Sequence, residues 1–134
     1  MATNARIGLK ISSSKMISIY LHWAGSPGSV GIKLLKYFNS EQKVKELITM
    51  GNASIIGNTI GSKVNFDNFK VNENSQCLFY ARDRGEINQE AETHEIGDNR
   101  YNYEFSYMFK CGAWYVRINK NYVLLTEKIC NRYF

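Results

Sequence analysis

The chain has 134 residues, of which 44% are hydrophobic and 22% charged, and this composition predicts a single globular domain over residues 1–134. A formal net charge of +5 favours anionic partners, but the absence of any run of five basic residues excludes a polybasic tail. No apolar run approaches the ~18 residues of a membrane span. Three widely spaced cysteines and no signal-like N-terminal segment predict a soluble protein of a reducing cytoplasm.

The first third of the chain predicts a β-hairpin followed by a helix. Apolar and β-branched residues dominate 5–10 and 16–21, and a polar ISSSK turn separates them. Ser26 followed by Pro27 is a helix-start signal, because a hydroxyl can cap a helix and proline suits its first position. Four apolar residues then recur at helical spacing: Val30, Leu34, Leu35 and Phe38.

A second short helix is expected directly after the first. Ser40 can cap a helix over 41–50, and Gly51 stands where a left-handed glycine ends a helix. Residues 52–76 are rich in Asn, Gly and Ser, and they predict an irregular connection with a short helical turn at 53–57.

The second half of the chain predicts strands. We expect a strand at 77–82, a polar loop or frayed helix at 87–100, and a meander of strands at 101–109, 113–118 and 122–128. The first meander strand alternates strictly and puts five aromatic side chains on one face: Tyr101, Tyr103, Phe105, Tyr107 and Phe109. Such a face either packs in the core or stacks on nucleobases. The order of elements predicts an α+β fold: an antiparallel sheet with two short helices packed on one face.

A glycine-rich stretch, HWAGSPGSVG, joins the hairpin to the first helix. Its glycines, Gly25, Gly28 and Gly31, are spaced by three, and backbone amides at a helix start can hold a phosphate, with Ser26 and Ser29 beside them. The pattern matches neither G-x-x-x-x-G-K-[ST] nor G-x-G-x-x-G. The alternative interpretation is structural, in which the glycines form a turn and allow close helix packing.

His22 and Trp23 precede these glycines. Adjacent residues of a strand point to opposite faces, so we expect one of the two to enter the core. Trp23 is the better core candidate, which leaves His22 to face a pocket or to make a hydrogen bond at the strand end. The chain has one other histidine, His94, and no metal-ligand spacing, so we expect no metal and no cofactor.

The stretch YARDRGE is the most concentrated charge cluster in the sequence. Tyr80, Arg82 and Arg84 could bind a phosphate-bearing ligand, because guanidinium groups bind phosphate with two hydrogen bonds. Alternatively, Asp83 and Glu86 neutralise the arginines in a surface network. Nothing in the sequence has a nucleophile motif such as G-x-S-x-G, so we expect a binding protein rather than an enzyme.

Five stretches of the chain together resemble a family of small proteins encoded by tailed bacteriophages, most of which carry no assigned function. The stretches are MATNARIGL, ISIYLHWAGSPGSVG, KVKELITMGNASIIG, YARDRGE and YNYEFSYMFK…WYVR, and they cover most of the chain in the same order. Related proteins tend to read HWDGYP where this chain reads HWAGSP, so Ala24 and Ser26 replace an acid and an aromatic residue. If that acid were catalytic, this chain would lack the activity. The resemblance implies a phage protein expressed in the cytoplasm of an infected bacterium.

The residues and the resemblance together suggest a counter-defence role, in which the chain binds a nucleotide-derived host immune signal and sequesters it without cleavage. Shared pockets would favour a homo-oligomer. The residues expected to bind the ligand are His22, Trp23, Gly25, Ser26, Gly28, Ser29, Tyr80, Arg82 and Arg84. Two other hypotheses stay open. One is a protein-binding inhibitor of a host defence or metabolic enzyme, and the other is a nucleic-acid binder that uses charge and stacking aromatics.

Overall fold

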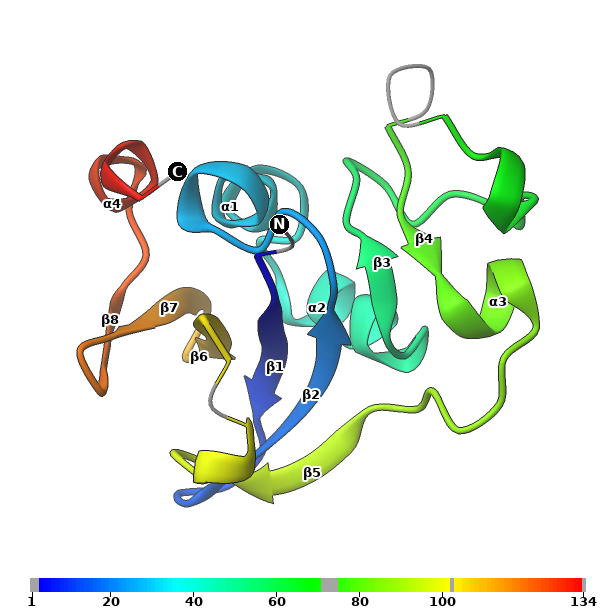
Figure 1. The fold of residues 1–134 in the computed structure, drawn as a ribbon. Helices are drawn as coiled ribbons and strands as arrows, with labels where there is room; N and C mark the ends of the chain where they lie inside the picture. Colours follow the sequence, from blue (N-terminus) through cyan, green and yellow to red (C-terminus); the bar gives the residue numbers. More distant parts are fainter. Residues whose placement is uncertain (1–2, 71–74, 102, 134) are drawn as a thin grey trace.

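The computed structural model describes residues 3–70, 75–101 and 103–133, and these residues build one eight-stranded sheet (Figure 1). The main path of the sheet runs β4-β3-β2-β1-β6-β7-β8, and β5 pairs with β2 beside that path. The strands are β1 (Ala5–Lys10), β2 (Lys15–Leu21), β3 (Ala53–Ile55), β4 (Leu78–Phe79), β5 (Glu92–Glu95), β6 (Phe105–Lys110), β7 (Ala113–Ile118) and β8 (Asn121–Leu124).

The α+β class is confirmed, but the sheet is mixed, and the prediction of a purely antiparallel sheet is wrong. β1 pairs antiparallel with β2 and parallel with β6, in the register Ala5↔Phe105. β2 also pairs parallel with β3, at Leu21↔Ala53. Alternation along a strand shows which side chains share a face, but it carries no information on the direction of the neighbouring strand. A parallel neighbour needs a long crossover, and here the two predicted helices supply it between β2 and β3.

Both predicted helices are confirmed. The first begins as a turn of π-type helix, η1 (Pro27–Gly31), and continues as α1 (Ile32–Tyr37), and the second is α2 (Glu41–Thr49). Four further elements were not predicted at these positions: η2 (Phe66–Asn68), α3 (Tyr80–Arg84), η3 (Asn99–Tyr101) and α4 (Glu127–Arg132). Helix α4 begins within the segment predicted as the last strand, because the Thr126 hydroxyl accepts a hydrogen bond from the Ile129 amide.

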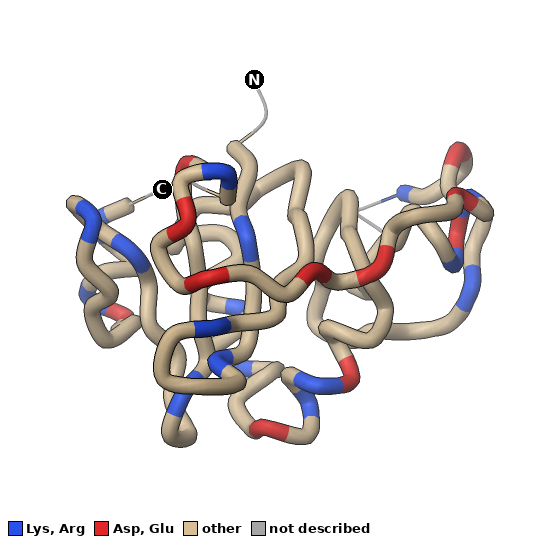
Figure 2. The backbone as a smooth tube through the Cα atoms, turned by 90° about the horizontal axis from the view of Figure 1, so that it is seen from below, with Lys and Arg blue, Asp and Glu red and all other residues tan. Residues whose placement is uncertain are grey.

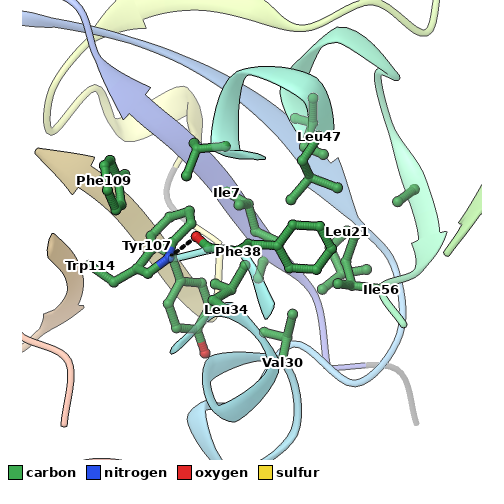
Figure 3. Close-up of a cluster of buried hydrophobic side chains, with 14 of the residues drawn as sticks. Ile7, Leu21, Val30, Leu34, Phe38, Leu47, Ile56, Tyr107, Phe109 and Trp114 are labelled. Atoms are coloured by element: carbon green, nitrogen blue, oxygen red, sulfur yellow. Dashed lines mark hydrogen bonds between the residues drawn. The ribbon is translucent and has the colours of Figure 1, made fainter. Parts of the chain in front are cut away.

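The main core lies between these helices and the sheet (Figure 3). Alternate residues of β1, β2, β6 and β7 meet the apolar side chains of the first two helices there, among them Ile7, Leu21, Val30, Leu34, Phe38, Leu47, Tyr107 and Trp114. Two of the largest buried side chains also make polar contacts. The indole Nε1 of Trp114 donates to the Phe38 carbonyl at 2.9 Å, and the Tyr107 hydroxyl donates to the Gly25 carbonyl at 2.7 Å. These bonds tie the sheet to both ends of the first helical segment.

The predicted strand at 77–82 is only two residues long in the structure and then becomes a helix. The Asp83 carboxylate accepts a hydrogen bond from the Phe79 amide at 2.8 Å and so caps the new helix from within. Gly85 ends that helix with φ +72°. Segments 53–57 and 87–100 also differ from expectation, since they contain β3 and β5. Both strands are short, and neither has the apolar alternation that predicts a strand.

The predicted aromatic strand at 101–109 begins later than expected, at Phe105. Its inner residues Tyr107 and Phe109 are 0% and 2% exposed, so this part of the aromatic stripe packs in the core. Tyr101 and Tyr103 precede the strand and lie outside the alternation. Asn102, which the predicted strand includes, is not among the described residues.

Two further observations concern membrane-spanning helices and cysteines in the described ranges of the chain. No helix in them is long and apolar enough to cross a membrane. The cysteines are free, with Cys77 and Cys130 buried and Cys111 exposed on the β6–β7 turn. Burial raises the pKa of the Cys77 thiol to about 11, so this thiol stays protonated at neutral pH and is a poor nucleophile.

The cap of α2 provides a first testable prediction. The Ser40 hydroxyl accepts a hydrogen bond from the Lys43 amide at 3.3 Å and so caps the start of this helix. We expect Ser40→Ala to lower the free energy of unfolding by about 1 kcal/mol, because the amide loses its acceptor. Urea unfolding followed by circular dichroism measures this loss. Ser40→Asp is the matched control and should retain the wild-type value, since aspartate caps equally well.

Candidate functional site

The glycine-rich loop, residues 25–29, directs its backbone amides into the protein. The Gly25 amide donates to the Thr3 carbonyl at 2.8 Å, and the Gly28 amide donates to the Tyr133 carbonyl at 2.7 Å. The Ser29 amide donates to the Ser26 carbonyl at 2.9 Å. A phosphate would therefore have to displace bonds that fix the chain ends and the helix start. The geometry favours the structural alternative for this loop.

Close packing explains two of the glycines. A Cβ at Gly25 would lie 2.8 Å from the Thr3 carbonyl oxygen and 2.9 Å from the Ala5 Cβ. A Cβ at Gly31 would lie 3.3 Å from the Cys130 sulfur, where η1 meets α4. The loop is thus a tight junction between β2, the first helix and the C-terminal segment.

Trp23 does not lie where it was expected, whereas His22 makes a hydrogen bond at the end of β2, which is one of its two expected roles. Trp23 is 45% exposed and lies outside the core, so its prediction as the core residue is wrong. His22 is half-buried, its Nδ1 lies 2.7 Å from the Tyr20 hydroxyl, and its ring meets the Trp23 ring edge-on at 4.8 Å. The physical reason is that β2 ends at Leu21. Strand alternation no longer applies beyond that residue.

Arg82 holds the structure around α3 together. Its guanidinium donates to the carbonyls of Ile60, Gly61 and Cys77 at 2.9–3.1 Å and to the Asp83 carboxylate at 2.9 Å. Burial by itself raises the pKa of Asp83. Hydrogen bonds from Arg82 and from the Phe79 and Val64 amides outweigh burial and hold the pKa below its usual value. This pair therefore acts as a structural brace rather than as a phosphate clamp.

Arg84, by contrast, lies on the surface over two aromatic rings. Its guanidinium carbon is 4.4 Å from the centre of the Phe66 ring and 5.3 Å from that of Tyr80, and the two rings stack at 5.5 Å. An ion pair to Glu86 at 2.5 Å holds the side chain in place. Arg84, Phe66 and Lys63 line a surface pocket of about 540 Å3, which we call the Arg84 pocket.

The predicted binding residues form two groups, one that follows β2 and one on α3, and β3 lies between them. The Tyr20 amide donates to the Asn52 side chain, and the Tyr80 amide donates to the Asn52 carbonyl. Adjacent strands are about 4.8 Å apart, which puts Tyr80 about 10 Å from β2. Partial burial raises the pKa of Tyr20, and the nearby Tyr80 hydroxyl raises it further. The glycine loop does not line the Arg84 pocket.

Sequence reasoning missed a buried polar cluster on the opposite face of the sheet. Arg6 is 3% exposed, and its guanidinium donates to the Ser18 hydroxyl at 2.9–3.0 Å and to the Ser18 carbonyl at 2.9 Å. The rings of Tyr101 and Tyr103 lie over it at 4.9 and 5.7 Å. Burial lowers the pKa of Arg6. The one signal in the sequence is an arginine between apolar residues of a buried strand.

The same cluster contains a serine–histidine pair. Ser18 Oγ lies 2.7 Å from His94 Nε2, and His94 Nδ1 lies 2.9 Å from the Glu95 carbonyl oxygen. Because a carbonyl only accepts, Nδ1 carries a hydrogen, and in the neutral ring Nε2 accepts from the Ser18 hydroxyl. The Tyr101 ring stacks on the imidazole at 3.9 Å, and Ser18 is 0% exposed. No substrate can reach this hydroxyl in the structure, so the pair stabilises the fold.

Comparison with known proteins gives no relative for this chain. No family model matches it, and neither a curated protein nor a solved structure does. Within the described residues, no group of three or more His, Cys, Asp or Glu could hold a metal ion.

Proposed function

We propose that this protein binds a nucleotide-type small molecule and sequesters it without cleaving it. The ligand would be a nucleotide-derived immune signal of a bacterial host, and the protein would be a phage accessory protein that acts in the host cytoplasm. The resemblance to small proteins of tailed bacteriophages supports the phage origin. The role of ligand binding rests on the Arg84 pocket.

One observation carries the proposal: a surface arginine stacked on two aromatic rings at the wall of a pocket. Arg84 lies over Phe66 and Tyr80, and the pocket lining also contains Lys63 and two acids, Asp67 and Asp83. The Asp83 carboxylate is engaged by Arg82, so Lys63 and Arg84 are the cations that remain for a phosphate. Aromatic faces stack on nucleobases, and guanidinium groups bind phosphates. The pocket volume of about 540 Å3 lies within the range that suits small-molecule ligands. These are the chemical groups that a nucleotide requires.

The geometry changes which predicted residues should touch the ligand. We expect direct contacts from Arg84, together with Phe66 and Lys63, which the sequence did not suggest, and a supporting role for Tyr80, whose ring stacks on Phe66. Arg82 positions α3 through its hydrogen bonds to neighbouring carbonyls. Bound phosphate would have to compete with Glu86 for Arg84, so we expect binding to involve displacement of that surface ion pair.

The experiment is a thermal-shift screen against cyclic nucleotides and ADP-ribose derivatives, followed by calorimetric titration of each hit. A ligand at about 100 times its Kd stabilises a protein by about 2.7 kcal/mol, which shifts the melting temperature of a small domain by several degrees. Native mass spectrometry of the complex then shows whether the ligand is recovered intact. A cleaved ligand would contradict sequestration and would indicate an enzyme.

Two substitutions test the site itself. We expect Arg84→Ala and Phe66→Ala each to weaken binding by about tenfold or more, because a charge-assisted contact or a stacked base contributes about 1.5–3 kcal/mol. Arg100→Ala is the matched control, since Arg100 is also a surface arginine paired with a nearby acid, Asp98. Its affinity should equal the wild-type value. Equal loss with Arg84→Ala and Arg100→Ala, and no loss with the uncharged change Phe66→Ala, would show that net charge, and not this pocket, determines binding.

A second candidate function is a protein-binding inhibitor of a host enzyme. The observation that favours it is the 45% exposure of Trp23, because exposed tryptophans are frequent energetic centres of protein interfaces. A host protein recovered in one-to-one ratio, lost with Trp23→Ala and insensitive to added nucleotide, would support this function instead.

A further inference from the structure

Three strands of the sheet have a neighbour on one side only. Among the described residues, β4 pairs with β3 alone, β5 with β2 alone and β8 with β7 alone. β4 is two residues long, whereas β5 and β8 have four residues each and form the two longer edges. Such edges present unpaired N–H and C=O groups that can pair with another chain. The two edges lie at opposite sides of the sheet, because β5 flanks β2 whereas β8 is the last strand beyond β7 (Figure 1).

The edge formed by β5 is acidic. Segment 86–98, which we call the acidic edge, contains no Lys or Arg and has five acids: Glu86, Glu90, Glu92, Glu95 and Asp98. Three of these acids form ion pairs with arginines outside the segment, and Glu90 and Glu95 are the two that form none with another described residue. Figure 2 shows acidic positions following one another along the strip that crosses the front of the molecule. The segment also carries Ile87, whose side chain is 80% exposed. Charge and exposed apolar surface thus occur together on this edge.

The edge formed by β8 has no charge on the strand itself, but basic residues precede it and follow it on α4. Segment 120–132, which we call the basic edge, contains Lys120, Lys128 and Arg132 against one acid, Glu127. Its strand exposes two large apolar side chains, with Val123 at 36% and Leu124 at 50%. Val123, Ile129 and Arg132 help to line an open surface pocket of about 430 Å3. Figure 2 shows basic positions over much of the molecule, several of them on the side where the C-terminus lies.

We infer that these two edges bind one another between copies of the chain, so that β8 of one copy extends the sheet beside β5 of the next. Opposite charge attracts unlike edges, whereas two acidic edges or two basic edges repel each other. Hydrogen bonds between the strands add affinity, and the exposed apolar side chains of both edges become covered. Because the two surfaces differ, the contact is head-to-tail, and it closes into a ring or continues as an open chain of copies.

The proposal does not depend on ligand binding at the Arg84 pocket. Arg84 and Phe66 belong to neither edge, and the pocket that they line contains no residue of β5 or β8. Glu86 is the one residue of the acidic edge that pairs with Arg84, and the variants described below leave it unchanged. A protein that fails to bind nucleotides could still self-associate, and a monomer could still bind them. The two proposals therefore fail separately.

Charge reversal tests the inference with residues that the fold does not need. Glu90, Glu95, Lys120 and Arg132 are exposed, and no ion pair joins their side chains to another described residue. Glu90→Lys with Glu95→Lys makes an acid-reversed variant. Lys120→Glu with Arg132→Glu makes a base-reversed variant. A control variant, Lys36→Glu with Lys43→Glu, changes the net charge as the base-reversed variant does, but on the helical face.

Sedimentation velocity of each protein from about 10 to about 500 μM measures self-association. We expect the wild type and the control to associate, and each edge variant alone to associate at least tenfold more weakly. Mixing the two edge variants should restore association, because each reversed edge then meets an edge of opposite charge. Raising the salt from about 50 to about 500 mM should weaken the wild-type contact through screening. A monomeric wild type over the whole range, or no recovery on mixing, overturns the inference.

Discussion

Trp114→Ala is expected to lower the free energy of unfolding by about 3–5 kcal/mol, which is the usual cost of truncating a fully buried large aromatic side chain. Trp114 is 1% exposed and belongs to the core cluster, where its ring meets the Phe109 ring edge-on at 5.3 Å. Its indole also donates to the Phe38 carbonyl at the end of α1. The substitution therefore removes apolar packing and one buried hydrogen bond together.

Two further variants separate these contributions in chemical denaturation. Trp114→Phe keeps an aromatic ring but leaves the Phe38 carbonyl without its donor, and we expect a smaller loss of about 1–3 kcal/mol. Trp23→Ala is the control, because Trp23 is exposed and its loss should change stability by less than about 0.5 kcal/mol. If Trp114→Ala were as stable as Trp23→Ala, the helices would not pack on the sheet as described.

Asp83→Asn is expected to lower the free energy of unfolding by about 3 kcal/mol at neutral pH, because it breaks a buried charge pair on one side only. The carboxylate accepts hydrogen bonds from the Val64 and Phe79 amides and from Arg82. An asparagine offers one acceptor oxygen in place of two. Its NH2 group faces a donor, and the guanidinium keeps its charge without a counter-ion.

The same variant isolates a pH dependence. Burial raises the pKa of Asp83, but the hydrogen bonds from Arg82 and from two amides lower the pKa by more than burial raises it. The folded pKa therefore lies below the unfolded value of about 3.9. A group with a lowered folded pKa stabilises the fold above the unfolded pKa and loses this contribution as the pH falls through the folded pKa. The stability difference between wild type and Asp83→Asn should hold from about pH 5 to 7 and shrink below about pH 4.

A matched control makes this result specific to Asp83. Asp67→Asn changes an exposed acid on η2 and should leave stability within about 0.5 kcal/mol of the wild-type value at each pH. Asp98 also titrates in acid, but only at about pH 2, because the hydrogen bond from Arg100 lowers its pKa to about 2. That acid is present in all three proteins, so its effect cancels in the comparison. A difference that stays constant down to pH 2 would contradict the assignment.

The helices and the central hairpin could be predicted because each depends on local signals. Residues 5–10 and 16–21 alternate between apolar and small or polar side chains, and the structure has β1 and β2 at these positions. Ser40 and Gly51 mark the ends of α2 as expected, with Gly51 at φ +81°. Such caps act within one turn of the chain, so the sequence alone contains them.

The remaining features depend on contacts that are distant in sequence. The parallel pairing of β1 with β6 joins residues 5–9 to 105–109, and no local pattern shows it. Arg82 and Arg84 look equivalent in the sequence, yet one braces three carbonyls and the other lies over two rings on the surface. Phe66 comes from segment 52–76, for which the sequence predicted an irregular connection and no binding residue. The pocket forms because the fold places η2 beside α3, and the two elements are distant in the sequence.

The parallel pairing of β1 has a consequence for synthesis on the ribosome. β1 ends at Lys10, whereas its partner β6 begins at Phe105, so about 95 residues separate the two sides of the central pair. At about 5–20 residues per second, the ribosome needs about 5–20 s to make that interval. During this time β1 has β2 as its only available neighbour in the main path of the sheet. Completion of the core must therefore follow translation of the last third of the chain, and a nascent chain stalled before Phe105 should remain sensitive to protease.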